Sequence, residues 1–156
     1  MDVRIMPVEA SDPEFARLVA ALDAYLIPLY PAQSNHGLPI GALRAAGVRV
    51  WLARAGMRAA GCVCLFVGED KLPEIKRLYV DPAFRGCGIA SALLTRLEGW
   101  ARGQGFRDLY LETGIYQMDA VALYEKQGFS RVGRFGAYPD DPLSLYMHKP
   151  IADDVF

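Results

Sequence analysis

One stretch of the sequence carries the strongest structural signal: Val80-Asp81-Pro82-Ala83-Phe84-Arg85-Gly86-Cys87-Gly88-Ile89-Ala90. It follows a β-rich run that must end at Pro82, because proline cannot donate to a strand ladder. Beyond it, apolar residues recur at helical spacing. Gly86 and Gly88 permit a tight turn between the two, and the free N–H groups of a helix's first turn attract anions. The stretch therefore predicts a strand, a glycine turn and a helix start suited to a pyrophosphate.

Two common nucleotide-binding motifs do not fit this turn. A dinucleotide-binding fingerprint would need a third glycine where the chain has Ser91, and it would need an early strand–helix–strand unit that the sequence lacks. A Walker A loop would end in Gly-Lys-Ser or Gly-Lys-Thr, and neither tripeptide occurs. Both classes of binding loop are therefore disfavoured.

Three β-rich runs precede the turn, at residues 48–54, 59–67 and 72–80. The first two flank residues 55–58, a short turn containing Gly56, which is typical of a hairpin. We therefore expect three antiparallel strands side by side.

Regular alternation along the third run, barring a bulge, would divide its side chains between the two faces of the sheet. The even-numbered set, on one face, is Glu74, Lys76, Leu78 and Val80. The odd-numbered set, on the other face, is Ile75, Arg77 and Tyr79.

The N-terminal part predicts one strand and two helices. Residues 2–7 alternate as a strand would, and the capping box at residues 11–14 then starts a helix with Ser11 as its N-cap. Helical spacing of apolar residues continues until Pro28. A shorter helix is expected over residues 40–46, with Gly47 at its C-terminal cap.

Downstream of the turn, helices and strands alternate. The spacing predicts helices over residues 89–101 and 119–127, and strands over residues 107–113, 130–135 and 143–149. The whole order is a mixture of antiparallel and parallel strand pairing, which places the chain in the α/β class.

Length and composition favour one globular unit covering residues 1–156. The chain is 53% hydrophobic and 22% charged, and its net charge of −1 argues against nucleic-acid binding by bulk electrostatics. Residues 76–107 are locally basic, with six Lys or Arg against two Asp or Glu, which suits either a local anion site or a solvated helix face.

Cysteine usage and the absence of long apolar runs point to a reducing compartment. The three cysteines, Cys62, Cys64 and Cys87, form no CxxC pair, so neither a disulfide framework nor a metal site is expected. The sequence starts without a basic segment followed by an apolar run, and no stretch approaches the ~18 apolar residues of a membrane span. We therefore expect a cytoplasmic location and no membrane partner.

Two segments together resemble a known family. Arg85-x-x-Gly88-x-Ala90 is similar to the Q/R-x-x-G-x-G/A pattern of the GNAT superfamily of acyl-CoA-dependent N-acetyltransferases. Gln117-x-x-Ala120-x-x-Leu123-Tyr124-Glu125-Lys126-x-Gly128-Phe129 resembles a second family segment, in the same order along the chain. The family most often has asparagine where this chain has Gln117.

The resemblance implies a fold and an activity. The GNAT fold has a mixed central sheet of about six to seven strands, with a splay between the fourth and fifth strands, flanked by about four helices. The implied activity is transfer of an acetyl group from acetyl-CoA to a primary amine of a small molecule or protein, by direct attack in a ternary complex without a metal. A homodimer is compatible with it. The alternative is a non-catalytic regulatory module that binds CoA or acyl-CoA.

The resemblance also implies a coenzyme site. The pantetheine arm would lie along the fourth strand, at Leu78, Tyr79 and Val80. The diphosphate would rest on the turn, at Arg85, Gly86, Cys87, Gly88, Ile89 and Ala90. Gln117 and Tyr124 would complete the site from the following helix.

For catalysis, the resemblance implies Tyr124 as the acid that protonates the departing thiolate. Its phenol stays protonated at neutral pH, although a core tyrosine packing under Leu109 and Leu111 is the structural alternative. Glu74 is the first candidate for the base, and an exposed strand-end carboxylate paired with Lys76 or Lys71 is its alternative. Glu112 is the second candidate for the base.

The loop between the first two helices covers the acceptor side in this family. It supplies four candidate substrate-binding residues, Tyr30, Gln33, Asn35 and His36. An ordinary surface loop is the alternative interpretation of this polar segment.

Overall fold

The computed structural model describes residues 2–34 and 47–152, and it contains a seven-stranded mixed sheet in the order β1-β2-β3-β4-β5-β7-β6. The strands are β1 (Val3–Val8), β2 (Gly47–Ala55), β3 (Arg58–Val67), β4 (Pro73–Val80), β5 (Asp108–Gly114), β6 (Ser130–Val132) and β7 (Ser144–Pro150). The expected hairpin is confirmed, because β2 and β3 pair antiparallel across the turn at Gly56.

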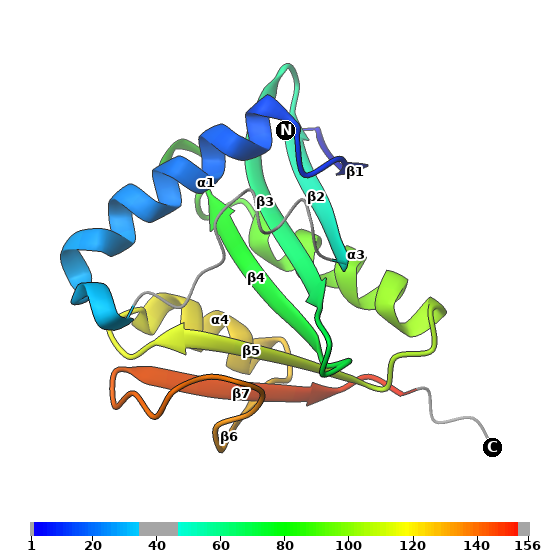
Figure 1. Ribbon diagram of the computed structural model, residues 1–156. Coiled ribbons are helices and arrows are strands. Elements are labelled where there is room, and N and C mark those ends of the chain that lie inside the picture. The colour runs from blue at the N-terminus through cyan, green and yellow to red at the C-terminus, as the bar shows by residue number, and fades with distance from the viewer. Residues whose placement is uncertain (1, 35–46, 153–156) are drawn as a thin grey trace.

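Helices cover both faces of this sheet (Figure 1). One face carries α1 (Pro13–Leu26), and the opposite face carries α3 (Ile89–Gly103) and α4 (Met118–Lys126). Short 3₁₀ turns lie at Ile27–Leu29, Ala32–Ser34 and Pro82–Phe84. Within the described ranges no helix is both long and apolar enough to cross a membrane. The helix expected over residues 40–46 lies outside the described residues.

The splay expected from the family resemblance is confirmed between β4 and β5. These parallel strands form only two residue pairs, Glu74 with Tyr110 and Ile75 with Leu111. Beyond them the strands diverge, as Figure 1 shows, so the facing backbone groups of β4 and β5 no longer pair with one another. The other neighbouring strand pairs are antiparallel.

The core is divided by the sheet into two clusters. On the α3 and α4 face, residues such as Trp51, Leu93 and Leu97 are almost completely buried. On the α1 face, Phe15 and Leu18 pack against the buried thiols Cys62 and Cys64. Burial raises the pKa of the Cys62 thiol to about 12, and the neighbouring Cys64 thiol is raised as well. Both cysteines act as small apolar core residues.

A β-bulge on β4 overturns the simple alternation expected for this strand. Cys62 pairs with Tyr79 but Cys64 pairs with Lys76. Between these two pairs β4 therefore contains one residue more than β3. Arg77 lies at the bulge with a φ of 60°, in the left-handed region. As a result Tyr79 packs on the α1 face with the core around Phe15.

Beyond the bulge, the even-numbered residues change face. Leu78 and Val80 pack with Ile75 in the cluster on the α3 face, whereas Lys76 pairs with Cys64, which belongs to the α1 cluster. The predicted sharing of one face by Glu74, Lys76, Leu78 and Val80 is therefore wrong beyond position 76, because the inserted residue reverses the pleat.

Two other local expectations also need correction. Asp12, not Ser11, is the N-cap of α1: its carboxylate accepts a hydrogen bond from the Glu14 amide at 2.8 Å. Pro13 favours this start because it occupies the first helical position, where no N–H is needed. Gly47 is the first residue of β2 and not a helix cap.

The strand expected over residues 130–135 is shorter than predicted, since β6 ends at Val132. The chain then runs as an irregular loop up to β7, and this loop is anchored by aromatic contacts. The Phe135 ring lies 5.1 Å from that of Tyr110 on β5 and 5.6 Å from that of Tyr146 on β7. These contacts draw Phe135 over the sheet instead of extending it along β7.

Candidate active site

Two cavities meet at the opening between β4 and β5. The first, of about 310 Å³, is lined by α1, β4, β5, α4 and the loop before β7, and we call it the splay cavity. The second, of about 520 Å³, is lined by β4, residues 84–86 and 88–91 and the start of α4, and we call it the turn cavity. Leu22, Leu78 and Gln117 line both, so the two spaces adjoin.

The turn cavity presents backbone donors at the start of α3. Gly86 and Gly88 have φ values of 78° and 77°, and Gly88 is the N-cap of α3 without a capping side chain. A Cβ at either glycine would meet no atom within 4 Å, so the space above the turn is open. Amides of a first helical turn, with the positive end of the helix dipole behind them, suit a diphosphate.

Arg85 adds a positive charge to the turn. Its Nε donates to the carbonyl of Val80 at 3.2 Å, and its guanidinium lies 5.9 Å from the centre of the Tyr79 ring. The side chain is exposed, so the guanidinium can turn toward an anion bound above the glycines. The residues of the turn cavity therefore fit the diphosphate of a coenzyme.

Most of the residues predicted to bind coenzyme line the turn cavity. They are Leu78, Tyr79, Val80, Arg85, Gly86, Gly88, Ile89, Ala90 and Gln117. Cys87 is exposed but is not among the lining residues, and Tyr124 lines the splay cavity instead.

Tyr124 lies both in the hydrophobic core and at a cavity, the two positions considered from the sequence. Its ring belongs to the core cluster that contains Leu109 and Leu111, and it lies 5.8 Å from the Phe129 ring. It also lines the splay cavity, so a core position and access to a ligand are combined in one side chain. Burial raises the pKa of Tyr124, and the charge of Glu112 raises it further, so the phenol remains protonated well above neutral pH.

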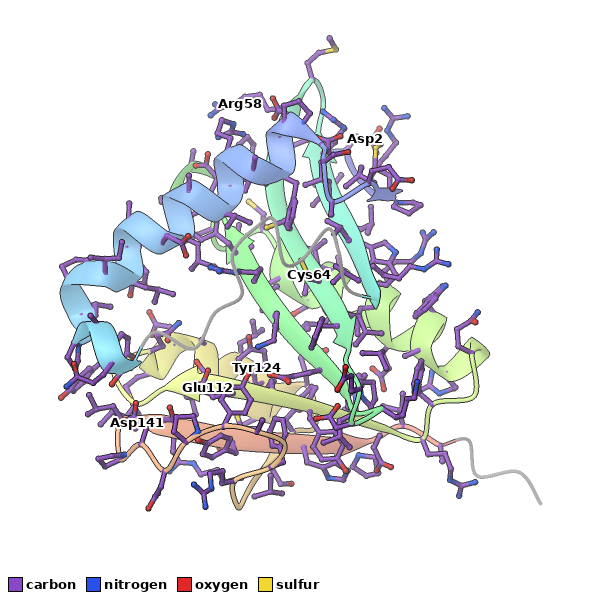
Figure 2. The ribbon with its side chains drawn as sticks, in the orientation of Figure 1. Asp2, Arg58, Cys64, Glu112, Tyr124 and Asp141 are labelled. Atoms are coloured by element: carbon purple, nitrogen blue, oxygen red, sulfur yellow. The ribbon has the colours of Figure 1, made fainter. Side chains whose placement is uncertain are left out.

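Glu112 lies on β5 one position beyond the last residue paired with β4. It lines the splay cavity and accepts a hydrogen bond from the Ser144 hydroxyl at 2.7 Å. Figure 2 shows Glu112 and Tyr124 close together beside β5, in agreement with the electrostatic effect of one on the other. A carboxylate and a phenol thus share one cavity.

Glu74 is placed differently from Glu112. It is only 7% exposed, and its carboxylate is 3.1 Å from the Lys76 ammonium and accepts a hydrogen bond from the Tyr138 hydroxyl. The pairing with Lys76 is the one considered from the sequence, but the expected exposure is wrong. Among the described residues, Lys76 and Tyr138 line the splay cavity and Glu74 does not.

Tyr30 and Gln117 tie the end of α1 to the start of α4. The Tyr30 hydroxyl accepts a hydrogen bond from the Tyr116 amide at 3.0 Å and donates to Gln117 Oε1 at 3.4 Å. Gln117 Oε1 also accepts from the Gly114 amide at 3.1 Å. A Cβ at Gly114 would lie 1.9 Å from the Tyr30 hydroxyl oxygen, so glycine is required for this contact. Burial raises the pKa of Tyr30.

The predicted acceptor-side residues are only partly covered by the described structure. Tyr30 lines the splay cavity, whereas Gln33 is exposed and lines neither cavity. Asn35 and His36 lie outside the described residues. The cavity also includes Lys76, Arg77 and Tyr138, which the sequence did not single out for this site.

Arg77 is held by α1. Its guanidinium forms an ion pair with Asp23, and both residues line the splay cavity. Positive and negative groups thus face the same space. In the described part of the chain, no three His, Cys, Asp or Glu side chains are grouped so that they could hold a metal ion.

Comparison with known proteins identifies the family. The profile of the acetyltransferase (GNAT) family matches residues 12–129, most of the chain. The chain belongs to the GNAT acetyltransferase family. An IAA acetyltransferase from Azospirillum brasilense is 45% identical over 136 residues, which cover 86% of this chain and 89% of the relative.

Solved structures agree with this family membership. A crystal structure from Klebsiella pneumoniae, assigned as an acyl-CoA N-acyltransferase, matches with a TM-score of 0.80 and 36% identity, covering 96% of this chain and 97% of that one. The PaiA N-acetyltransferase of Thermoplasma acidophilum in complex with coenzyme A shares the fold, with a TM-score of 0.73 and 16% identity, covering 96% and 99%. The names of the GNAT relatives support acyl-CoA-dependent acetyl transfer as the activity of this chain.

Proposed function

We propose that this protein transfers the acetyl group of acetyl-CoA to a primary amine by direct attack in a ternary complex. The observation that carries the proposal is the junction of the two cavities at Leu22, Leu78 and Gln117. A coenzyme whose diphosphate rests in the turn cavity can pass its pantetheine arm along β4 to that junction. Its thioester would then face Tyr124 and Glu112 in the splay cavity.

The reaction needs two proton transfers, and we assign one residue of the splay cavity to each. The amine nitrogen attacks the thioester carbonyl carbon, the C–S bond breaks, and the nitrogen loses a proton to Glu112 directly or through a water molecule. Tyr124 gives its phenolic proton to the departing thiolate. Burial raises the pKa of Tyr124, so its phenol holds the proton that this step requires.

Between the two carboxylates considered as the base, we assign this role to Glu112. Glu112 lines the cavity in which the amine would bind, whereas the Glu74 carboxylate contacts Lys76 and the Tyr138 hydroxyl. A base must come within hydrogen-bond reach of the proton that it removes, directly or through one water molecule. Glu74 is better placed to support the wall of the cavity.

A thiol-release assay with acetyl-CoA tests this proposal. The acceptors should cover small aliphatic amines, aromatic amines, amino acid esters and a peptide with a free N-terminus. Amine-dependent release of CoA together with the acetylated amine in the product mixture is expected. Coenzyme binding without release by any of these amines would instead favour the non-catalytic regulatory module.

A further inference from the structure

Three polar side chains, the half-buried Tyr138 and the nearly buried Lys76 and Glu74, form a cluster at the floor of the splay cavity. The Tyr138 hydroxyl donates to Glu74 Oε2 and accepts from the Lys76 ammonium at 2.7 Å, while Lys76 and Glu74 form an ion pair at 3.1 Å. The Lys76 side chain is 11% exposed and that of Glu74 is 10% exposed. Ionised groups removed from water in this way form stronger hydrogen bonds than neutral ones and hold their partners in fixed positions.

This cluster fixes what the Tyr138 hydroxyl can offer to a ligand. A phenol carries one proton and two acceptor lone pairs. The proton is directed to Glu74, and Lys76 donates to the oxygen. Any group in the cavity that hydrogen-bonds to this oxygen must therefore be a donor, as an amine N–H is, and not an acceptor such as a carbonyl or a carboxylate.

The ring of Tyr138 is fixed as well. It lies 5.5 Å from the ring of Phe135 in edge-to-face geometry and 5.6 Å from that of Tyr146. The Tyr146 hydroxyl in turn donates to the carbonyl of Pro139 at 3.3 Å. Two aromatic neighbours and one backbone bond thus hold the loop that carries Tyr138 over the sheet, which pre-organises the side chain.

We propose that Tyr138 orients the acceptor amine by accepting a hydrogen bond from its nitrogen, and that Glu74 and Lys76 are positioning residues that hold Tyr138. The inference rests on the proposed amine acetylation and assigns a specificity to the same site: substrates must present an N–H to the floor of the splay cavity. Glu74 then acts through Tyr138 and takes no proton from the substrate.

A binding experiment with a conjugate of both substrates tests this without turnover. The probe is CoA whose sulfur is joined through a CH₂–C(=O)–NH link to an n-butyl group, so that an amide N–H stands where the reacting amine would. Calorimetric titration gives Kd for CoA and for the conjugate, and their ratio measures the contribution of the acceptor side. The wild-type protein should bind the conjugate more tightly than CoA.

Tyr138→Phe should reduce that ratio by about 3- to 10-fold, the usual range for one hydrogen bond, while Kd for CoA itself stays unchanged. Glu74→Gln should reduce the ratio in the same direction, because the hydroxyl loses its ionised partner. Tyr110→Phe is the matched control: it removes a hydroxyl from the same aromatic cluster and keeps the ring that contacts Phe135, and Tyr110 does not line the described splay cavity, so the ratio should stay at the wild-type value.

The proposal is overturned if Tyr138→Phe and Glu74→Gln both keep the wild-type ratio, or if the wild-type protein binds the conjugate no better than CoA. The proposed amine acetylation is tested separately, by the thiol-release assay with free amines, and does not depend on these binding results. Amine-dependent release combined with an unchanged ratio would mean that acetylation occurs without help from Tyr138. A low ratio in Glu74→Gln alone, with a normal melting temperature, would still support the positioning role if Tyr138→Phe failed to fold.

Discussion

The turn cavity and the splay cavity recognise their ligands with different parts of the chain. The turn cavity offers backbone amides of one continuous stretch around Gly86 and Gly88, whereas the splay cavity is lined by side chains from α1, β4, β5, α4 and the loop before β7. Backbone donors survive most substitutions and are lost only when the backbone itself changes conformation. A site made of side chains can be damaged by one substitution of a lining residue, even when the backbone keeps its conformation. The two cavities should therefore differ in which mutations damage them and in which kinetic constant responds.

The largest effect should come from Tyr124→Phe in the splay cavity. The change deletes the proposed acid and keeps the ring that packs against Phe129. Turnover should fall about 10²- to 10⁴-fold, as is usual when general-acid assistance is lost, while Kd for CoA changes little. Steady-state kinetics with a fixed amine and calorimetry provide the two measurements. Normal turnover with a lower melting temperature would instead mean that Tyr124 is purely a core residue.

Glu112→Gln should come next, with a fall of roughly 10²-fold at neutral pH, at the lower end of the range for a general base because water can replace it in part. A base works only when deprotonated, so kcat/KM of the wild-type protein falls as the pH drops through the pKa of the base. The variant should lose this acidic limb of the profile. Glu74→Gln is the matched comparison and should retain it. The reverse result would move the role of base to Glu74.

Coenzyme binding should stabilise the folded protein by mass action. At a CoA concentration one hundred times Kd, the free energy of unfolding should rise by ~2.7 kcal/mol. Thermal unfolding followed by circular dichroism measures the shift, and NAD and ATP at the same concentration should give no comparable one. An unchanged melting temperature at millimolar CoA would contradict the assignment of the turn cavity.

Gly88→Val tests whether the turn cavity depends on its backbone. Gly88 has a φ of 77°, a conformation that costs an L-residue roughly 1–2 kcal/mol, and most for a β-branched side chain. A shift of the turn should weaken CoA binding about tenfold, whatever the new side chain touches. Gly133→Ala is the control, because Gly133 has open space around it without a positive φ. Unchanged affinity in a folded Gly88→Val protein would place the diphosphate elsewhere.

The smallest effect is expected for Tyr30→Phe, at the edge of the splay cavity. The variant loses the hydrogen bonds that the Tyr30 hydroxyl makes with the Tyr116 amide and Gln117. The free energy of unfolding should fall by about 1 kcal/mol, measured by urea denaturation. Tyr25→Phe, at an exposed position near the end of α1, should leave the free energy of unfolding unchanged. Equal stabilities for both variants would show that this link between α1 and α4 contributes nothing.

The sequence alone predicts those parts of the molecule whose conformation depends on neighbouring residues in the chain. The glycine turn, the hairpin at Gly56 and the order of strands around β4 follow from turn chemistry and from the period of apolar residues. Glu112 and Tyr124 could be named because they lie on elements whose positions the family resemblance supplies. That they line one cavity is visible only once the strands are placed.

Non-local contacts set the limit of this reasoning. Tyr138 lies in an irregular loop whose path depends on the rings of Tyr110, Phe135 and Tyr146, and nothing in its neighbouring sequence marks it as part of a site. The burial of Glu74 likewise depends on this loop, since the Tyr138 hydroxyl and Lys76 contact its carboxylate. Periodicity cannot reveal contacts made across 64 residues of chain.

The bulge at Arg77 lets β4 hold one extra residue without disturbing the two core layers. Before the bulge, Ile75 faces the α3 layer and Lys76 the α1 layer; after it, Tyr79 faces α1 and Val80 faces α3. Between Lys76 and Tyr79, β4 has two residues where β3 has one, so deleting one of the two would leave a regular strand in which Lys76 and Tyr79 keep their partners Cys64 and Cys62. Natural relatives with a strand one residue shorter should therefore keep both core layers and lose the left-handed backbone at Arg77.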